Sequence, residues 1–277
     1  MNNPTTETSP IGAALPDHRL AICGATDVGA VRADNQDTFV IADLRSGDLS
    51  NPCNRTEFPL SKRGILLLVC DGMGGAAAGD LAARVAAEAI KEQLVGARPA
   101  AAESPNESLK SAVSGANGAV LAEAKAHPEA RGMGTTCTAA IVLPDRLFVA
   151  QVGDSRAYLL RDGRLQLLTR DQTMADQLVE MGALRADQVD TFPYRHVLIQ
   201  AVGTRSTIDP ITSEAPLRIG DRILLCSDGL HGPVPDHEIG RILGGAADIN
   251  RAAHELIQAA LTAGGPDNVT VVVADCE

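Results

Sequence analysis

The order of strand-like and helix-like segments constrains this fold more than any other feature of the sequence. Residues 65–70 form a continuous apolar run of strand length, and residues 76–95 and 106–126 repeat apolar side chains at helical spacing. Four short strand-like segments follow, and the chain then returns to helices before it ends in a strand. This order lacks the regular alternation of a parallel α/β sheet, so it favours the α+β class.

The predicted strands span residues 20–23, 38–42, 65–70, 137–143, 147–152, 157–161, 165–168, 222–226 and 269–274. The predicted helices span residues 76–95 and 106–126, paired as a hairpin, and then residues 172–182, 235–243 and 249–263. Residues 1–18 are predicted to form a flexible tail, and the polar residues 44–64 an exposed hairpin or loop. No shift of composition divides the remainder, which predicts one domain over residues 19–277.

Composition and charge limit the class of protein. The 277 residues are 45% apolar and 21% charged, which suits a globular chain with a sizeable core. Aromatic residues make up only 2%, so the core must be built from Ala, Val, Leu and Ile. The net charge of −11 argues against a nucleic-acid partner and against a basic membrane-binding surface.

The termini and cysteines indicate a compartment. The longest aliphatic run is far shorter than a membrane span, and residues 1–19 lack a basic start followed by an apolar stretch. We therefore expect no signal peptide, no membrane segment and a cytoplasmic location. The six cysteines form no CxxC pair, and five lie in or beside strand-like apolar runs, which predicts buried free thiols in a reducing compartment.

Aspartates stand at the ends of the most apolar predicted strands. Asp37 begins one strand, Asp71 and Asp228 end buried strands, Asp154 follows a strand, and Asp267 precedes the last one. Each alone is explained by a turn, because Asp-Gly favours turns. Five carboxylates gathered on one rim would repel each other, and a hard divalent cation would remove that repulsion. Their placement therefore favours a Mg²⁺ or Mn²⁺ site.

Other chemistries fit the sequence less well. The six histidines show no zinc-binding spacing, no nucleophile elbow is present, and Gly72 to Gly75 lack the Lys and Ser or Thr of a phosphate-binding P-loop. Arg32 lies five residues before Asp37. Its guanidinium is a candidate for gripping phosphate oxygens, and a surface salt bridge is the equally balanced alternative.

Several spaced motifs resemble those of the metal-dependent type 2C Ser/Thr protein phosphatases of bacterial type, the PPM family. They are RADNQD, VCDGMGG, GTT, VGDSRAY, LTRDQT, LLCSDGL and DNVTVVV, in the family's order from about residue 20 to 276. The resemblance implies a four-layer α-β-β-α sandwich of two antiparallel sheets flanked by helices. It also implies a flap beside the active site at about residues 172–200.

The resemblance carries metal-binding roles onto matching positions. Asp71 is expected to bridge two Mn²⁺ or Mg²⁺ ions, with the Gly72 carbonyl on one of them. Asp228 and Asp267 would complete the first site and Asp37 the second.

The same comparison implies further roles. Asp154, together with Asp228, would hold a possible third ion. Arg32 would bind the substrate phosphate, and Asn268 and Ser155 would support the ligands without touching a metal.

The sequence departs from the family pattern in places. Gln36 and Met73 stand where many eukaryotic members have Glu and a His proposed as the acid for the leaving group, although bacterial members commonly carry Gln and Met. The general acid is thus open, and a metal-bound water is one candidate. Gln172 stands where His is frequent, and the polar residues 44–63 are a longer stretch than usual that could face a substrate or partner.

The function implied is hydrolysis of phosphoserine and phosphothreonine in proteins by a metal-bridging hydroxide. The expected partners are phosphoproteins, including a Ser/Thr protein kinase, with no nucleic acid and no membrane, and the chain is expected to be a monomer. The alternative is a non-catalytic or partner-regulated signalling module on the same fold. A module of that kind should lack one of the four core aspartates, and all four are present.

Overall fold

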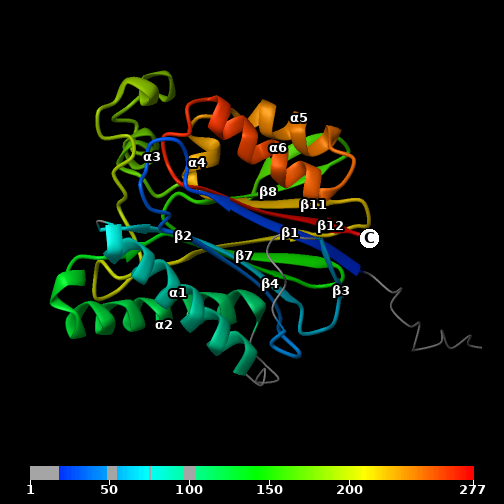
Figure 1. The fold of residues 1–277 in the computed structure, drawn as a ribbon, viewed down its shortest axis with the longest axis horizontal. Coiled ribbons are helices and arrows are strands. Elements are labelled where there is room, and N and C mark those ends of the chain that lie inside the picture. The colour runs from blue at the N-terminus through cyan, green and yellow to red at the C-terminus, as the bar shows by residue number, and fades with distance from the viewer. Residues whose placement is uncertain (1–18, 49–54, 75, 97–103) are drawn as a thin grey trace, which may run out of the picture.

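Two antiparallel sheets packed face to face form the centre of the computed structural model, which describes residues 19–48, 55–74, 76–96 and 104–277 (Figure 1). The first sheet runs in the order β3 (Thr56–Pro59), β1 (Arg19–Asp27), β12 (Val269–Cys276), β11 (Arg222–Cys226), β8 (Arg156–Arg161) and β9 (Arg164–Leu167). The second runs in the order β10 (Ile211–Pro216), β7 (Arg146–Val152), β6 (Cys137–Val142), β4 (Ile65–Met73) and β2 (Asp37–Asp43), with the short β5 (Gly134–Thr135) paired to β4. The predicted tail at residues 1–18 lies outside the described residues.

Helices cover both outer faces of this sandwich. The long pair α1 (Ala76–Gly96) and α2 (Pro105–Ala126) lies on the second sheet. The first sheet is covered by α4 (Asp228–His231), α5 (Asp236–Gly245) and α6 (Ile249–Thr262). The predicted α+β class and the four layers implied by the resemblance are therefore confirmed.

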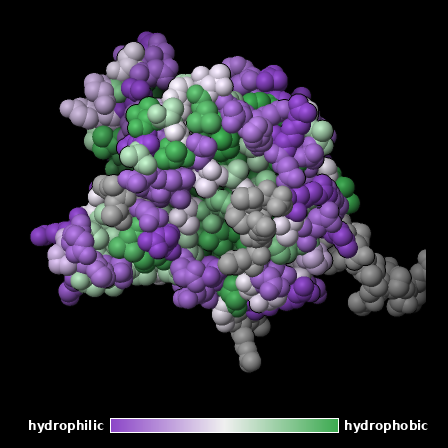
Figure 2. Space-filling model, viewed as in Figure 1, coloured by the Kyte–Doolittle hydropathy of each residue, from purple (hydrophilic) through white to green (hydrophobic). Residues whose placement is uncertain are grey.

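A separate lobe projects from one end of the sandwich. It contains α3 (Met174–Glu180) and the 3₁₀ helix η2 (Ala186–Thr191), while a second 3₁₀ helix, η1 (Pro128–Ala130), follows α2. Figure 1 shows this lobe at the upper left, and Figure 2 shows that its visible surface is mostly hydrophilic. The helix predicted over residues 172–182 is the shorter α3, which spans only Met174–Glu180.

The strand β4 explains why the chain carries a continuous apolar run. Its side chains alternate between two buried faces, so Leu66 and Leu68 pack under α1 and α2 while Ile65 and Leu67 pack between the sheets. Neither face meets solvent. The alternation between polar and apolar side chains that marks most antiparallel strands is therefore absent here.

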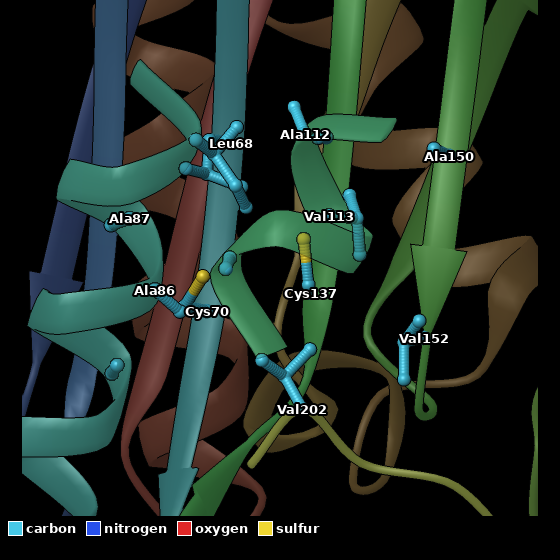
Figure 3. Packing of buried hydrophobic residues seen from close by; sticks show 14 of the residues in the cluster. Leu68, Cys70, Ala86, Ala87, Ala112, Val113, Cys137, Ala150, Val152 and Val202 are labelled. Carbon is cyan, nitrogen blue, oxygen red and sulfur yellow. The ribbon is translucent and has the colours of Figure 1, made fainter. Parts of the chain in front are cut away.

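The layer between α1, α2 and the second sheet is built from small and aliphatic side chains. Figure 3 shows Ala86 and Ala87 of α1 close to Leu68 and Cys70 of β4. Small helix side chains let the helix backbone approach the sheet, so this layer closes without large aromatic rings. The same figure shows Cys137 in this cluster, and all five cysteines among the described residues are buried free thiols, as predicted. Cys53 lies outside those residues.

Three strands were not expected, and one of them is the two-residue β5. The segment predicted as an exposed hairpin or loop over residues 44–64 contains β3, and β10 lies where no element was predicted. Both are edge strands, and each buries few side chains, chiefly Phe58 in β3 and Ala215 in β10. A strand that pairs along one side and packs little apolar surface shows no clear hydrophobic pattern. None of the helices among the described residues combines the length and the apolar character needed to cross a membrane.

Candidate active site

A cavity of about 590 Å³ opens at the end of the sandwich next to the projecting lobe. Antiparallel pairing brings the carboxyl ends of β4 and β11 to the same end as the amino ends of β2 and β12. Four of the five predicted aspartates line this cavity. The predicted phosphate-binding arginine, the glycine with the predicted carbonyl ligand and one predicted supporting asparagine line it too. These lining residues are Arg32, Asp71, Gly72, Asp154, Asp228, Asp267 and Asn268.

Asp71 and Asp37 face each other across the pairing of β4 with β2. Burial raises the pKa of Asp71 well above its ordinary value, and the negative charges of Asp37 and Asp228 raise it further. The interaction between the Asp71 and Asp228 carboxyls raises the pKa of Asp71 and lowers that of Asp228. The carboxylates are thus crowded enough to resist ionisation together.

The backbone at Asp71 is fixed by the two threonines of the GTT motif. Thr136 Oγ1 accepts a hydrogen bond from the Asp71 amide at 3.0 Å, and the Thr136 amide donates to the Asp71 carbonyl at 2.8 Å. Thr135 Oγ1 donates to the same carbonyl at 2.9 Å. Ser155 Oγ lies 2.7 Å from Thr136 Oγ1, so Ser155 supports Asp71 indirectly, through its hydrogen bond with Thr136. Sequence reasoning assigned no role to these threonines, although it recognised their motif.

Asp37 is held by a residue that the sequence analysis missed. Ser227 Oγ donates to Asp37 Oδ2 at 2.7 Å and accepts the amide of Thr270 at 2.9 Å. Asp37 Oδ1 is buried without a hydrogen-bond partner. Burial raises the pKa of Asp37 to about 7, even though its hydrogen bond with Ser227 lowers it. The signal for Ser227 was its position directly before Asp228.

Asp228 and Asp154 line the cavity, whereas Asp37 is not among its lining residues. Burial raises the pKa of both carboxyls, and the charge of each neighbouring aspartate adds to the effect. Asp228 Oδ1 is the second buried carboxylate oxygen here without a hydrogen-bond partner. His231 lies 3.0 Å from the Asp154 carbonyl, and burial lowers its pKa to about 3, so its ring is neutral at physiological pH.

Arg32 makes a salt bridge at the edge of the cavity. Its guanidinium lies 2.6 Å from Asp267 Oδ2, and this hydrogen bond raises the pKa of Arg32. Its side chain remains 55% exposed. Asn268 secures the loop that carries Arg32, because its amide donates to the carbonyls of Val28 and Asp34 and its oxygen accepts the amide of Gln36. Arg32 thus forms the salt bridge of one prediction, and it also lines the cavity where the phosphate-binding prediction would place it.

Gly72 allows the end of β4 to approach α1. A Cβ atom at this position would lie 2.1 Å from the carbonyl oxygen of Gly79, closer than any real contact. Only glycine fits here. Asp71 therefore supplies a fixed carboxylate, and Gly72 lets the backbone of α1 pack directly against the end of β4.

The carboxylate oxygens are of a type that binds hard divalent cations, but their side chains are not arranged as a metal site. Among the described residues, no three His, Cys, Asp or Glu side chains form a ready-made metal site. Ser227 holds Asp37 and Arg32 holds Asp267, so these two side chains are engaged elsewhere. The buried, partnerless oxygens of Asp37 and Asp228 are nevertheless the ligand type that Mg²⁺ and Mn²⁺ prefer. The donor types of the set therefore fit such a cation.

Residues 172–200 join the cavity through a short pairing at the base of the lobe. Thr173 pairs with Leu198, and the amide of Met174 donates to the carbonyl of Val197 at 2.7 Å. Gln172 Oε1 accepts the amide of Gly153 at 2.9 Å, which ties the lobe to the loop that carries Asp154. His196 and Leu198 from this lobe line the cavity.

The model of the protein phosphatase 2C family matches residues 57–262. The chain belongs to the protein phosphatase 2C family. Among its relatives, the Ser/Thr protein phosphatase PstP of Mycobacterium tuberculosis is 38% identical over 256 residues, which cover 92% of this chain and 45% of that protein. The chain thus spans less than half the length of this relative. The Ser/Thr phosphatase stp of Listeria monocytogenes is 30% identical over 90% of this chain and 93% of its own length.

A solved structure agrees with this family membership. The catalytic domain of PstP in complex with two manganese ions is 35% identical, has a TM-score of 0.75 and matches 94% of this chain and 99% of its own length. The likeness covers nearly the whole of this chain.

Proposed function

We propose that this chain is a metal-dependent phosphatase that hydrolyses phosphoserine and phosphothreonine in proteins. The observation that carries the proposal is the gathering of buried carboxyls around one cavity with an arginine at its edge. Carboxylates alone would repel a phosphorylated substrate. The cavity therefore suits a phosphate only when cations neutralise those carboxylates.

The metal-binding roles follow from the carboxylates and from the family. Asp71 would contribute to both of two cation sites, with the Gly72 carbonyl, Asp228 and Asp267 in the first and Asp37 in the second. When bound, the cations supply an activated water and neutralise the charge of the phosphoryl group. Mn²⁺ and Mg²⁺ both suit these oxygen ligands. The solved relative with two manganese ions supports Mn²⁺ and a pair of ions.

A third cation would lie further from the centre. Asp154 and Asp228 would hold it, and both are buried carboxyls whose pKa values are raised. Ser155 and Asn268 support the site through their neighbours, because Ser155 contacts Thr136 and Asn268 secures the loop of Arg32.

The chain's own residues bind and orient the substrate. Arg32 exchanges its contact with Asp267 for the phosphate oxygens, which releases Asp267 to bind a cation. The exchange costs little, because Arg32 is more than half exposed and its salt bridge is screened by solvent. Asn268 keeps the backbone around Arg32 in place during this exchange.

The physiological context of this activity is part of the same proposal. The substrates are phosphoproteins, and a Ser/Thr protein kinase is expected among them. The five buried free thiols suit a reducing, cytoplasmic compartment. The monomeric state, the single domain over residues 19–277 and the role of residues 172–200 as a flap stay predictions.

Phosphate release from a phosphothreonine peptide tests the function. The chain should release phosphate with Mn²⁺, stop when EDTA is added, and lose turnover in the Asp71→Asn variant. Asp209→Asn is the matched control, because Asp209 is an exposed surface aspartate that pairs with Lys110 away from the cavity. No release from the unaltered chain at any Mn²⁺ or Mg²⁺ concentration would favour the non-catalytic alternative, and full activity of Asp71→Asn would remove Asp71 from the site.

A further inference from the structure

The departing Ser or Thr oxygen needs a proton for which the residues discussed so far offer no donor. An alkoxide is a strong base, so protonation during bond cleavage speeds such reactions by about 10²–10⁴-fold. Met73, which follows Gly72, carries a thioether with no proton to give. Arg32 donates no proton because a guanidinium keeps its protons in proteins. Carboxylates that bind cations have already lost their protons.

One imidazole lies in the wall of the cavity. His196 comes from the projecting lobe, and it is the only histidine among the described residues that line this cavity. Imidazole is the side chain whose ordinary pKa lets it both carry and release a proton near neutral pH. We propose that His196 donates the proton to the Ser or Thr oxygen when the phosphoryl group is removed. This inference rests on the proposed phosphatase function.

The backbone around His196 holds the residue at the edge of the cavity. The amide of Val197 donates to the carbonyl of Tyr194 at 3.1 Å, which closes a turn that contains His196. Directly after the turn, the chain pairs with residues 172–174 through the bridge between Thr173 and Leu198. Gln172 exchanges two hydrogen bonds with Gly153, next to Asp154. The lobe that carries His196 is therefore joined to the loop of Asp154, one of the proposed ligands. His196 itself lies on a separate segment of the same cavity wall.

The ring of His196 is free to meet a substrate. Within the part of the chain that the structure describes, no hydrogen bond or ion pair is made by its nitrogens, and the residue is exposed. The charged and titratable groups that share the cavity with it are Arg32, Asp34, Asp71, Asp154, Asp228 and Asp267, with His231 adjoining. Burial raises the pKa of Asp228, whereas the charge of protonated His196 lowers it, so the field of the imidazolium reaches the proposed metal ligands.

The proton balance of the step is simple. The bond between phosphorus and the Ser or Thr oxygen breaks, and its electron pair stays on that oxygen. The N–H proton of His196 moves to the same oxygen, so a neutral alcohol leaves and a neutral imidazole remains. Water supplies the new oxygen of the phosphate product, and solvent returns the proton to the exposed ring.

The test compares two substrates with leaving groups of different basicity. In the Mn²⁺-loaded full chain, His196→Gln should lower kcat for a phosphothreonine peptide by about 100-fold, because the alcohol depends on proton donation. It should lower kcat for p-nitrophenyl phosphate by less than about threefold, because p-nitrophenolate leaves without a proton. His254→Gln, an exposed histidine on α6, is the matched control and should match the unaltered chain with both substrates.

The outcomes separate this inference from the function on which it rests. Equal losses with both substrates, or no loss with either, would overturn the assignment of His196 and favour a metal-bound water as the donor. Failure of the unaltered chain to hydrolyse either substrate would instead overturn the proposed function, and this assignment with it.

Discussion

Replacement of Asp37 by Asn should stabilise the metal-free protein at high pH and hardly at all at low pH. Burial raises the pKa of the Asp37 carboxyl from 3.8 to about 7. Each unit of pKa corresponds to about 1.4 kcal/mol, so ionisation of this group in the folded protein costs about 4 kcal/mol at pH 8 and about 1 kcal/mol at pH 4.5. The variant removes this cost and keeps an oxygen that can accept the hydroxyl of Ser227.

The direction of the pH dependence follows from proton binding. Between about pH 4 and pH 7 the folded protein keeps a proton on Asp37 that the unfolded chain has lost. The free energy of unfolding of the metal-free wild type should therefore fall as pH rises through this range. The free energy of unfolding of Asp37→Asn minus that of the wild type should grow by about 3 kcal/mol from pH 4.5 to pH 8. Urea unfolding in EDTA at the two pH values measures it.

The comparison between pH values makes this prediction independent of how well Asn packs. Any packing cost of the substitution is present at both pH values and cancels. If the two proteins lose stability in parallel as pH rises, Asp37 is not a buried carboxyl with a raised pKa. Mn²⁺ at 100 times its dissociation constant should narrow the difference at pH 8, because it stabilises the wild type by about 2.7 kcal/mol and the variant lacks one proposed ligand.

Three further outcomes are expected. Arg32→Ala should raise KM for a phosphopeptide about tenfold or more, and unchanged steady-state constants would remove Arg32 from the substrate site. Asn117→Ala should destabilise the fold by about 2–3 kcal/mol in urea unfolding. The Asn117 side-chain oxygen accepts the backbone amide of Gly203, and its side-chain nitrogen donates to the carbonyl of Arg205. A change below about 0.5 kcal/mol would contradict this expectation. Gly72→Ala should lower the melting temperature because its Cβ would meet the α1 backbone, whereas Gly118→Ala, on an open face of α2, should raise it. Equal shifts in the two glycine variants would contradict the close approach at Gly72.

The sequence predicts the central strands and long helices well, because their residues face one kind of environment throughout. Every position of residues 65–70 is buried, so the apolar run identifies a strand without any knowledge of the fold. The helices α1 and α2 bury a regular stripe of small residues against one sheet. The positions of Asp71 and Asp228 at the ends of such strands then predict where the carboxylates gather.

Edge strands and long-range contacts could not be predicted in the same way. The strands β3 and β10 bury few side chains, so their local sequence hardly differs from that of a loop. The salt bridge between Arg32 and Asp267 joins residues 235 positions apart. The bond between Ser227 and Asp37 depends on which strands become neighbours, and Ser227 lies next to its partner only after both sheets have formed.

The location of the carboxyls at the ends of largely buried strands explains how the fold tolerates them. Strands that pack on both faces cannot bend away from one another, so Asp71 and Asp37 stay close despite their mutual repulsion. On flexible loops the same charges would move apart into solvent, and their pKa values would return to the ordinary range. The rigidity of the apolar sandwich is therefore the property that keeps an unfavourable group of charges together, and a cation that binds there recovers the electrostatic cost. Substitutions that loosen the layer between the sheets should weaken metal binding even where they touch no ligand.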